Sequence, residues 1–188
     1  MKKNIGVSPA VFPMPVLLIA AYDENGTVNV MSAAWGMTNA NSKISLFIDE
    51  HHKTTKNIKA VKAFTVAIAD TEHMAQADYF GMVSGNKVPD KFEKSGCHAV
   101  KSEFVNAPVI EEFPITLECE LAEAIDTENM HAIVGRIVNV CVNEELLGDD
   151  GKVDASRIHA LMFDQFHFDY YEAGPRVGKA FSEGKALL

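Results

Sequence analysis

The feature of this sequence that most constrains its fold is a pair of apolar-rich runs joined by a short turn. The runs cover residues 15–22 and 27–35, and Asp23-Glu24-Asn25-Gly26 connects them. Asn-Gly between two apolar runs is a strong hairpin signal, because both residues tolerate a positive φ. The sequence therefore predicts two antiparallel strands at the start of the domain.

The rest of the chain continues this β-rich pattern. Apolar or alternating runs predict further strands at residues 43–49, 63–69, 115–124, 132–142 and about 163–171. Residues 53–62 predict a short helix with a threonine available as its N-cap, residues 71–83 predict a second helix, and residues 84–94 are typical of a loop. Six or seven strands with two or three short helices indicate a mainly β fold, either a barrel or a sandwich.

Length and charge limit the class of protein. A chain of 188 residues without a Pro-, Gly- or Ser-rich linker indicates one domain over residues 1–188, with a core at about 10–172 and a C-terminal tail at 173–188. The formal net charge of −9 argues against a nucleic-acid partner. The apolar run at 16–21 is far shorter than the roughly 20 residues of a transmembrane helix, so we expect a cytoplasmic protein with no membrane partner.

The motifs of several common enzyme classes are missing. The sequence has no G-x-G-x-x-G for a dinucleotide and no G-x-S-x-G for a hydrolase. Residues 174–180 resemble a phosphate loop, but the glycines are one residue too close and Ala180 replaces the hydroxyl that binds magnesium. The seven histidines include no H-E-x-x-H pair, so the sequence predicts no metal site and names no catalytic residue.

A basic segment stands out in this acidic chain. Residues 53–62 contain four lysines and no acid, and they follow a predicted strand. The free backbone N–H groups of a helix N-terminus, together with two threonine hydroxyls, an amide and a lysine, suit one phosphate group. The alternative is an ordinary capped helix whose lysines are only solvated.

A second candidate segment, residues 29–38, combines small residues with one tryptophan. Small side chains let a flat ring approach the backbone, while Trp35 and the methionines supply apolar contact, which suits a heteroaromatic cofactor. The alternative is a core strand with a packed tryptophan. The polar segment at 84–92 is either a lid or a solvent-exposed connection.

Several features in this order and spacing resemble the flavin reductase-like family, and within it the flavoredoxin branch. The resemblance extends from about Pro13 to Phe181 and rests on Pro13, Pro15, Asn25-Gly26, Asn29, Lys53-Thr54-x-x-Asn57, Phe64, Asp90-Lys91-Phe92 and Gly178-Lys179-Ala180-Phe181. No single motif among them is specific; their arrangement along the chain is.

The resemblance implies an FMN-binding split β-barrel, a Greek-key antiparallel barrel that forms a homodimer with FMN near the subunit interface. It places the FMN phosphate at Lys53, Thr54 and Asn57. The isoalloxazine ring and ribityl chain are expected at Asn29, Val30, Met31, Ser32, Trp35 and Thr38, with Lys91 and Phe163 as further contacts.

The implied activity is that of an FMN-dependent oxidoreductase. Hydride would come from NADH or NADPH, and electrons would pass to free flavin or to a redox protein. Because the flavin carries the chemistry, such an enzyme requires no catalytic triad. Two alternatives stay open: an FMN-binding electron carrier without a nicotinamide site, and a structural or sensor dimer that binds no flavin.

Overall fold

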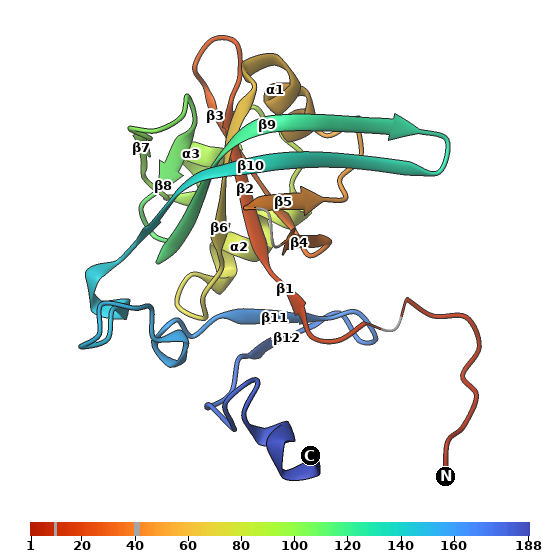
Figure 1. Cartoon of the computed structure of the whole chain (residues 1–188). Helices are drawn as coiled ribbons and strands as arrows, with labels where there is room; N and C mark the ends of the chain where they lie inside the picture. The colour runs from red at the N-terminus through yellow and green to blue at the C-terminus, as the bar shows by residue number, and fades with distance from the viewer. Residues whose placement is uncertain (10, 40–41) are drawn as a thin grey trace.

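The computed structural model describes residues 1–9, 11–39 and 42–188, so the predicted start of the core at residue 10 lies outside the described residues. The main element is a seven-stranded antiparallel sheet with the order β3-β2-β6-β9-β10-β5-β4. Its strands are β2 (Leu17–Tyr22), β3 (Val28–Ala33), β4 (Gly36–Asn39), β5 (Lys43–Leu46), β6 (Ala63–Ile68), β9 (Ile115–Thr127) and β10 (Met130–Val142). The sheet curls on itself, and the long β9–β10 hairpin extends beyond its neighbours (Figure 1).

Two smaller sheets and three helices surround the main sheet. One small sheet has the order β1-β11-β12 and the other pairs β7 with β8. The remaining elements are β1 (Met14–Pro15), β7 (Ala99–Lys101), β8 (Pro108–Ile110), β11 (Leu161–Asp164), β12 (Asp169–Glu172), α1 (Lys53–Val61), α2 (Met74–Met82), α3 (Lys91–Ser95) and the short 3-10 helices η1 (Glu144–Leu146), η2 (Ala155–Arg157) and η3 (Glu183–Leu187). No helix in the described ranges is long and apolar enough to cross a membrane.

The predicted β2–β3 hairpin is confirmed, with a longer turn than a two-residue loop. Leu17 lies opposite Ala33 and Tyr22 opposite Val28. Asp23 N donates to the Thr27 carbonyl at 2.9 Å, and the Asp23 carboxylate accepts from the backbone of Asn25 and Thr27. Gly26 has φ +82°, a value that favours glycine.

Strand β2, next to the edge strand β3, is covered on both faces, which explains its unbroken apolar run. Leu18 belongs to one core cluster, together with Phe80 of α2. Leu17 belongs to the other cluster, together with Ile58 of α1 and Phe64 of β6. Helices α1 and α2 therefore lie on opposite sides of the sheet at its β3–β2 edge. A strand that is buried on both faces shows no alternation of polar and apolar residues.

Several predicted boundaries are wrong. The strand predicted at 43–49 ends at Leu46, and the helix predicted at 71–83 begins at Met74. The N-cap of α1 is His52 rather than a threonine, because Thr54 and Thr55 turn inward and the Thr55 hydroxyl donates to the Asp49 carbonyl at 2.7 Å. The predicted loop at 84–94 contains the start of α3, which begins after Asp90. Strand β9 continues past residue 124 and β10 begins before residue 132, because the backbones keep pairing there although the side chains are mostly exposed.

The predicted last strand at 163–171 is a hairpin of two strands. Phe163 pairs with Tyr170 across it, and the turn is stabilised by the Asp164 carboxylate, which accepts from the backbone N–H of Phe166 at 2.8 Å. Phe168 has φ +62° in this turn. The aromatic residues made the segment look like one continuous strand, but the Asp164 turn reverses the chain.

Candidate functional site

A cavity of about 410 Å³ lies where α1 and α2 meet the edge strand β3. We call it the first cavity. Its wall includes β3, the segment before α1, the first turn of α1, residues 80–85 at the end of α2, and Lys91 of α3. The site is therefore assembled from segments that are far apart in the sequence.

The α1 end of the first cavity is polar and can bind an anion. His52, Lys53 and Thr54 line it, the His52 side chain makes no capping hydrogen bond, and the first turn of α1 has no acidic residue. The first N–H groups of a helix have no intrahelical partner, and the helix dipole favours negative charge at this end. The first turn of α1 therefore offers donors and positive charge to the cavity.

A buried hydrogen bond fixes the floor of this polar end. Asn29 Nδ2 donates to Thr54 Oγ1 at 2.6 Å, and both residues are buried. The bond occupies an acceptor position of the hydroxyl, so its proton remains available to a ligand oxygen. Gly85 lies against the same group: a Cβ at Gly85 would fall 2.1 Å from Asn29 Oδ1. Only glycine permits this approach without displacing the Asn29 amide.

The Lys53 ammonium is positioned by an acid from the β2–β3 turn. Lys53 Nζ lies 3.5 Å from Asp23 Oδ2, and a third of its side chain is exposed. Burial alone would raise the pKa of Asp23, but hydrogen bonds from the backbone of Thr27 and Asn25 and the charge of Lys53 together lower it. Asp23 is therefore ionised at neutral pH and forms an ion pair with Lys53 beside the helix end.

The opposite end of the first cavity is aromatic and joins a second cavity of about 250 Å³. Trp35 lines both cavities and is 47% exposed, so it is not the packed core tryptophan of the alternative interpretation. Its ring meets Phe163 edge to face, with centroids 6.5 Å apart. Tyr170 also lines the second cavity, and its hydroxyl donates to Asp78 Oδ1 at 3.0 Å. Burial, followed by the Asp78 contact, raises the pKa of Tyr170 to about 12.

Lys91 is a buried cation in the wall of the first cavity. Its Nζ donates to the carbonyls of Phe80 at 3.2 Å and Val83 at 2.6 Å, which are at the C-terminal end of α2. A cation at this position satisfies carbonyls that the helix leaves unpaired. Burial lowers the pKa of Lys91 to about 8.

The structure brings together most of the residues that the sequence singled out. Asn29, Met31, Ser32, Trp35, Lys53, Thr54 and Lys91 line the first cavity. Phe163 lines the second cavity. Because β3 is an edge strand, side chains from both of its faces, including Met31 and Ser32, reach the first cavity.

Three of the predicted residues line neither cavity. Val30 is fully buried in the core cluster of Phe80, because its side chain points under α2. Thr38 is exposed on β4, where it pairs with Ile44. Asn57 lies one turn further along α1, in a separate pocket beside Lys53, and its buried Nδ2 has no hydrogen-bond partner within the described ranges.

Sequence reasoning missed several residues of the cavity wall. Phe47, Asp49, His52, Gly81, Met82 and Ser84 also line the first cavity. Asp49 and His52 immediately precede the predicted helix, and that position is the signal that could have identified them. Gly81 and Met82 reach the cavity only through the tertiary packing of α2.

Comparison with known proteins places this architecture. Residues 10–170 match the family described as flavin reductase like domain. The flavoredoxin of Desulfovibrio vulgaris (Miyazaki F) is 33% identical and has a TM-score of 0.92. The alignment covers 98% of this chain and 100% of that flavoredoxin. The flavoredoxin of Methanosarcina acetivorans is 28% identical, with a TM-score of 0.88 and 100% of both chains covered.

A more distant structure identifies the barrel type. A flavin reductase with a split barrel domain from Shewanella frigidimarina NCIMB 400 is 20% identical, with a TM-score of 0.79 over 90% of this chain and 86% of that one. This similarity concerns the fold, and with the curled seven-stranded sheet it confirms the predicted split barrel. The chain belongs to the flavin reductase-like domain family.

Proposed function

We propose that this protein binds FMN in the first cavity and works as a flavin oxidoreductase. The observation that carries the proposal is a single cavity with an uncapped helix N-terminus and a lysine at one end and an exposed tryptophan at the other. Its volume of about 410 Å³ is within the usual range of small-molecule sites. The phosphate, the polar chain and the flat ring of FMN match, in this order, the polar end, the middle and the aromatic end of the first cavity.

The polar end would hold the FMN phosphate. Lys53 supplies a positive charge, Thr54 supplies a hydroxyl proton, and the first turn of α1 supplies backbone N–H groups. Asn29 keeps the Thr54 hydroxyl in place through its 2.6 Å hydrogen bond. Hydrogen bonds to a charged group are among the strongest in proteins, so these contacts would dominate retention of the cofactor.

The middle and the aromatic end would hold the flavin ring. Met31 and Ser32 offer a narrow surface along β3, and Trp35 closes the side. Lys91 sits in the wall, where its charge favours additional negative charge in the cavity. FMN supplies hydride and single-electron chemistry when bound; the protein orients it and excludes water.

A nicotinamide donor would occupy the second cavity. That cavity shares Ser32, Trp35 and Met82 with the first, and its lining is mostly apolar. Phe163 and Trp35 form an aromatic wall against which a nicotinamide ring can lie. We infer that NADH or NADPH delivers hydride here and that free flavin or a redox protein accepts the electrons.

The alternative is an FMN-binding electron carrier without its own nicotinamide site. The 33% identity to a flavoredoxin and the half-exposed Trp35 at the cavity mouth favour it. Stopped-flow mixing of the FMN-loaded protein with NADH and with NADPH separates the two functions. Rapid bleaching of the flavin absorbance supports the reductase. Bleaching only by dithionite supports the carrier, and a protein that stays colourless after addition of FMN contradicts both.

We further propose that two copies of the chain pair beside the first cavity. Trp35, Met37 and Phe47 are 47%, 76% and 51% exposed at the β4–β5 end of the sheet. The Phe47 backbone N–H donates to the Trp35 carbonyl at 2.8 Å, so the three apolar side chains are carried by one connected edge. Light scattering after size exclusion should give a dimer for the native chain and a monomer for Met37→Glu. Phe104→Glu, in an exposed loop, is the control.

A further inference from the structure

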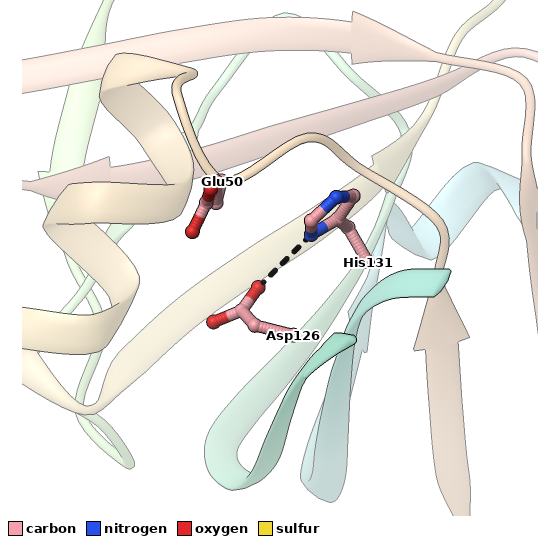
Figure 2. A group of neighbouring side chains, drawn as sticks. All are labelled: Glu50, Asp126 and His131. Carbon is pink, nitrogen blue, oxygen red and sulfur yellow. Dashed lines mark hydrogen bonds and ion pairs between the residues drawn. The ribbon is translucent and has the colours of Figure 1, made fainter. Parts of the chain in front are cut away.

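Three metal-ligating side chains meet on the side of the barrel, outside both cavities. Glu50 comes from the segment between β5 and α1, and Asp126 and His131 come from the far end of the β9–β10 hairpin (Figure 2). One oxygen of each carboxylate and one ring nitrogen of His131 all lie within 4.8 Å of one another. The side chains point toward a common space in Figure 2.

We propose that Glu50, Asp126 and His131 form a binding site for a divalent transition metal, with Zn²⁺ as the preferred ion. Zinc binds imidazole nitrogen and carboxylate oxygen at about 2.1 Å, which puts neighbouring ligand atoms of a tetrahedron about 3.4 Å apart. Because the three side chains are partly or fully exposed and their ligand atoms already lie within 4.8 Å of one another, small rotations suffice to reach that spacing. Water would occupy the fourth position.

The mixed set of ligands decides which ion is favoured. Magnesium and calcium prefer sites built from oxygen atoms, whereas imidazole beside carboxylates suits zinc and its neighbours. Two carboxylates and a neutral imidazole carry two negative charges, which a divalent ion neutralises. The site would therefore take Zn²⁺ in preference to Mg²⁺.

Lys59 of α1 orients one of the ligands. Its ammonium is paired with Asp126 Oδ2, and Asp126 Oδ1 lies 3.3 Å from His131 Nδ1. Lys59 thus leaves Oδ1 for the metal while it holds the other oxygen, as the outer partners of metal ligands commonly do.

A second cluster in the described chain, Asp164, His167 and Asp169, is less suited to a metal. All three residues belong to the β11–β12 hairpin. Asp164 already accepts from the backbone of Phe166 at 2.8 Å and contacts His167 Nδ1 at 3.0 Å. These bonds form the turn itself, so the Asp164 carboxylate has a structural role. The cluster around Glu50 instead joins two segments that only the fold brings together.

Metal binding at the Glu50 cluster would connect the hairpin to the rim of the first cavity. Asp49 and His52, on either side of Glu50, line that cavity. A bound ion would fix the segment that leads into α1. The sequence predicted no metal site because the ligands come from separate segments and form no local histidine motif.

Titration calorimetry of the untagged, chelator-treated chain with ZnCl₂ tests the proposal. We expect one Zn²⁺ per chain for the native protein, and at least about tenfold weaker binding for Glu50→Gln and for His131→Gln, each of which removes one ligand. The matched control His167→Gln removes a histidine from the other cluster and should bind like the native chain. MgCl₂ should bind at least about tenfold more weakly than ZnCl₂.

A second measurement separates binding from folding defects. Zn²⁺ should raise the melting temperature of the native chain and of His167→Gln, because a ligand that binds only the folded state stabilises it. It should leave the melting temperatures of Glu50→Gln and His131→Gln unchanged, and each variant should unfold in a cooperative transition without metal. Native-like zinc affinity in Glu50→Gln or His131→Gln, or its loss only in His167→Gln, would overturn the proposal.

Discussion

The two ends of the first cavity are built in different ways. At the polar end, Lys53 and Thr54 are neighbours on α1, and a 2.6 Å hydrogen bond fixes Thr54 to Asn29. At the aromatic end, Trp35 lies in the link between β3 and β4, and its ring meets Phe163 of β11 in the adjoining second cavity, with centroids 6.5 Å apart. At the polar end, local helix geometry brings Lys53 and Thr54 together, and a tertiary hydrogen bond then fixes Thr54; at the aromatic end, tertiary packing alone brings the two rings together.

This difference has an electrostatic consequence. Charge attraction at the polar end is weakened by salt, because Lys53 is partly exposed and screening acts over about 10 Å at 0.1 M ionic strength. Apolar contact at the aromatic end does not depend on charge. The contributions of the two ends to FMN binding can therefore be separated by changing ionic strength.

The largest effect is expected from the double change Lys53→Ala with Thr54→Val. Hydrogen bonds to charged groups are worth roughly 1.5–3 kcal/mol, so the Kd for FMN should rise by about tenfold or more. The salt dependence of the Kd should also fall. Quenching of FMN fluorescence at low and high salt measures both. Lys56→Ala, an exposed lysine on the same helix outside the first cavity, is the control for net charge. Unchanged FMN retention in the double variant would mean that the FMN phosphate does not bind at the polar end.

The second effect concerns Lys91, which lies in the wall of the first cavity. Because burial lowers its pKa from 10.5 to about 8, the folded state binds fewer protons than the unfolded state between these values. The free energy of unfolding should therefore rise with pH in this window, by about 2 kcal/mol between pH 7.5 and 9.5. Below pH 8 the cost of the buried charge is present in full.

Urea denaturation of the native chain and of Lys91→Met at both pH values isolates this contribution. The difference in unfolding free energy between the two proteins should change in favour of the native chain as the pH rises. Other titrating groups cancel, since both proteins share them. A difference that is the same at both pH values would mean that Lys91 is not desolvated in the folded state.

The sequence anticipated the polar end better than the aromatic end, for physical reasons. Lys53 and Thr54 are adjacent at a helix start, so residue type and position suffice to place them together. Phe163 could be placed in the second cavity only after the turn at Asp164 was known. Lys91 was singled out by resemblance alone, because the carbonyls that it satisfies belong to α2 and only packing brings them to it.

The fold and its fine details also differ in how far the sequence predicts them. The β2–β3 hairpin followed from Asn25-Gly26 between two apolar runs, whereas the burial of β2 on both faces is a finding of the structure. The inward rotation of Thr55, which leaves His52 as the N-cap, depends on the Asp49 carbonyl. That carbonyl is positioned by the chain path after β5, which no local pattern encodes.

The third effect is expected from Trp35→Ala at the aromatic end. Aromatic contacts contribute roughly 0.5–1.5 kcal/mol beyond burial, so the Kd for FMN should rise about fivefold. The increase should be the same at low and high salt, in contrast to the Lys53 and Thr54 variant. Phe104→Ala, an exposed aromatic residue in a loop outside both cavities, should leave the Kd unchanged. A salt-dependent loss in Trp35→Ala would break the distinction between the two ends.

The smallest effect is expected from Tyr170→Phe, which removes one hydroxyl from the second cavity. The hydroxyl donates to Asp78 Oδ1 at 3.0 Å, and a partly exposed hydrogen bond of this kind contributes about 1 kcal/mol to stability. Thermal melts should therefore show a small loss, and the Kd for FMN should stay within about twofold of the native value, because Tyr170 does not line the first cavity. Tyr171→Phe is the matched control: the neighbouring tyrosine is 47% exposed and contacts the Phe12 ring with its own ring, which the substitution keeps. Weaker FMN binding in Tyr170→Phe but not in Tyr171→Phe would mean that the aromatic end also holds the cofactor through a polar contact, and the two ends would then differ only in degree.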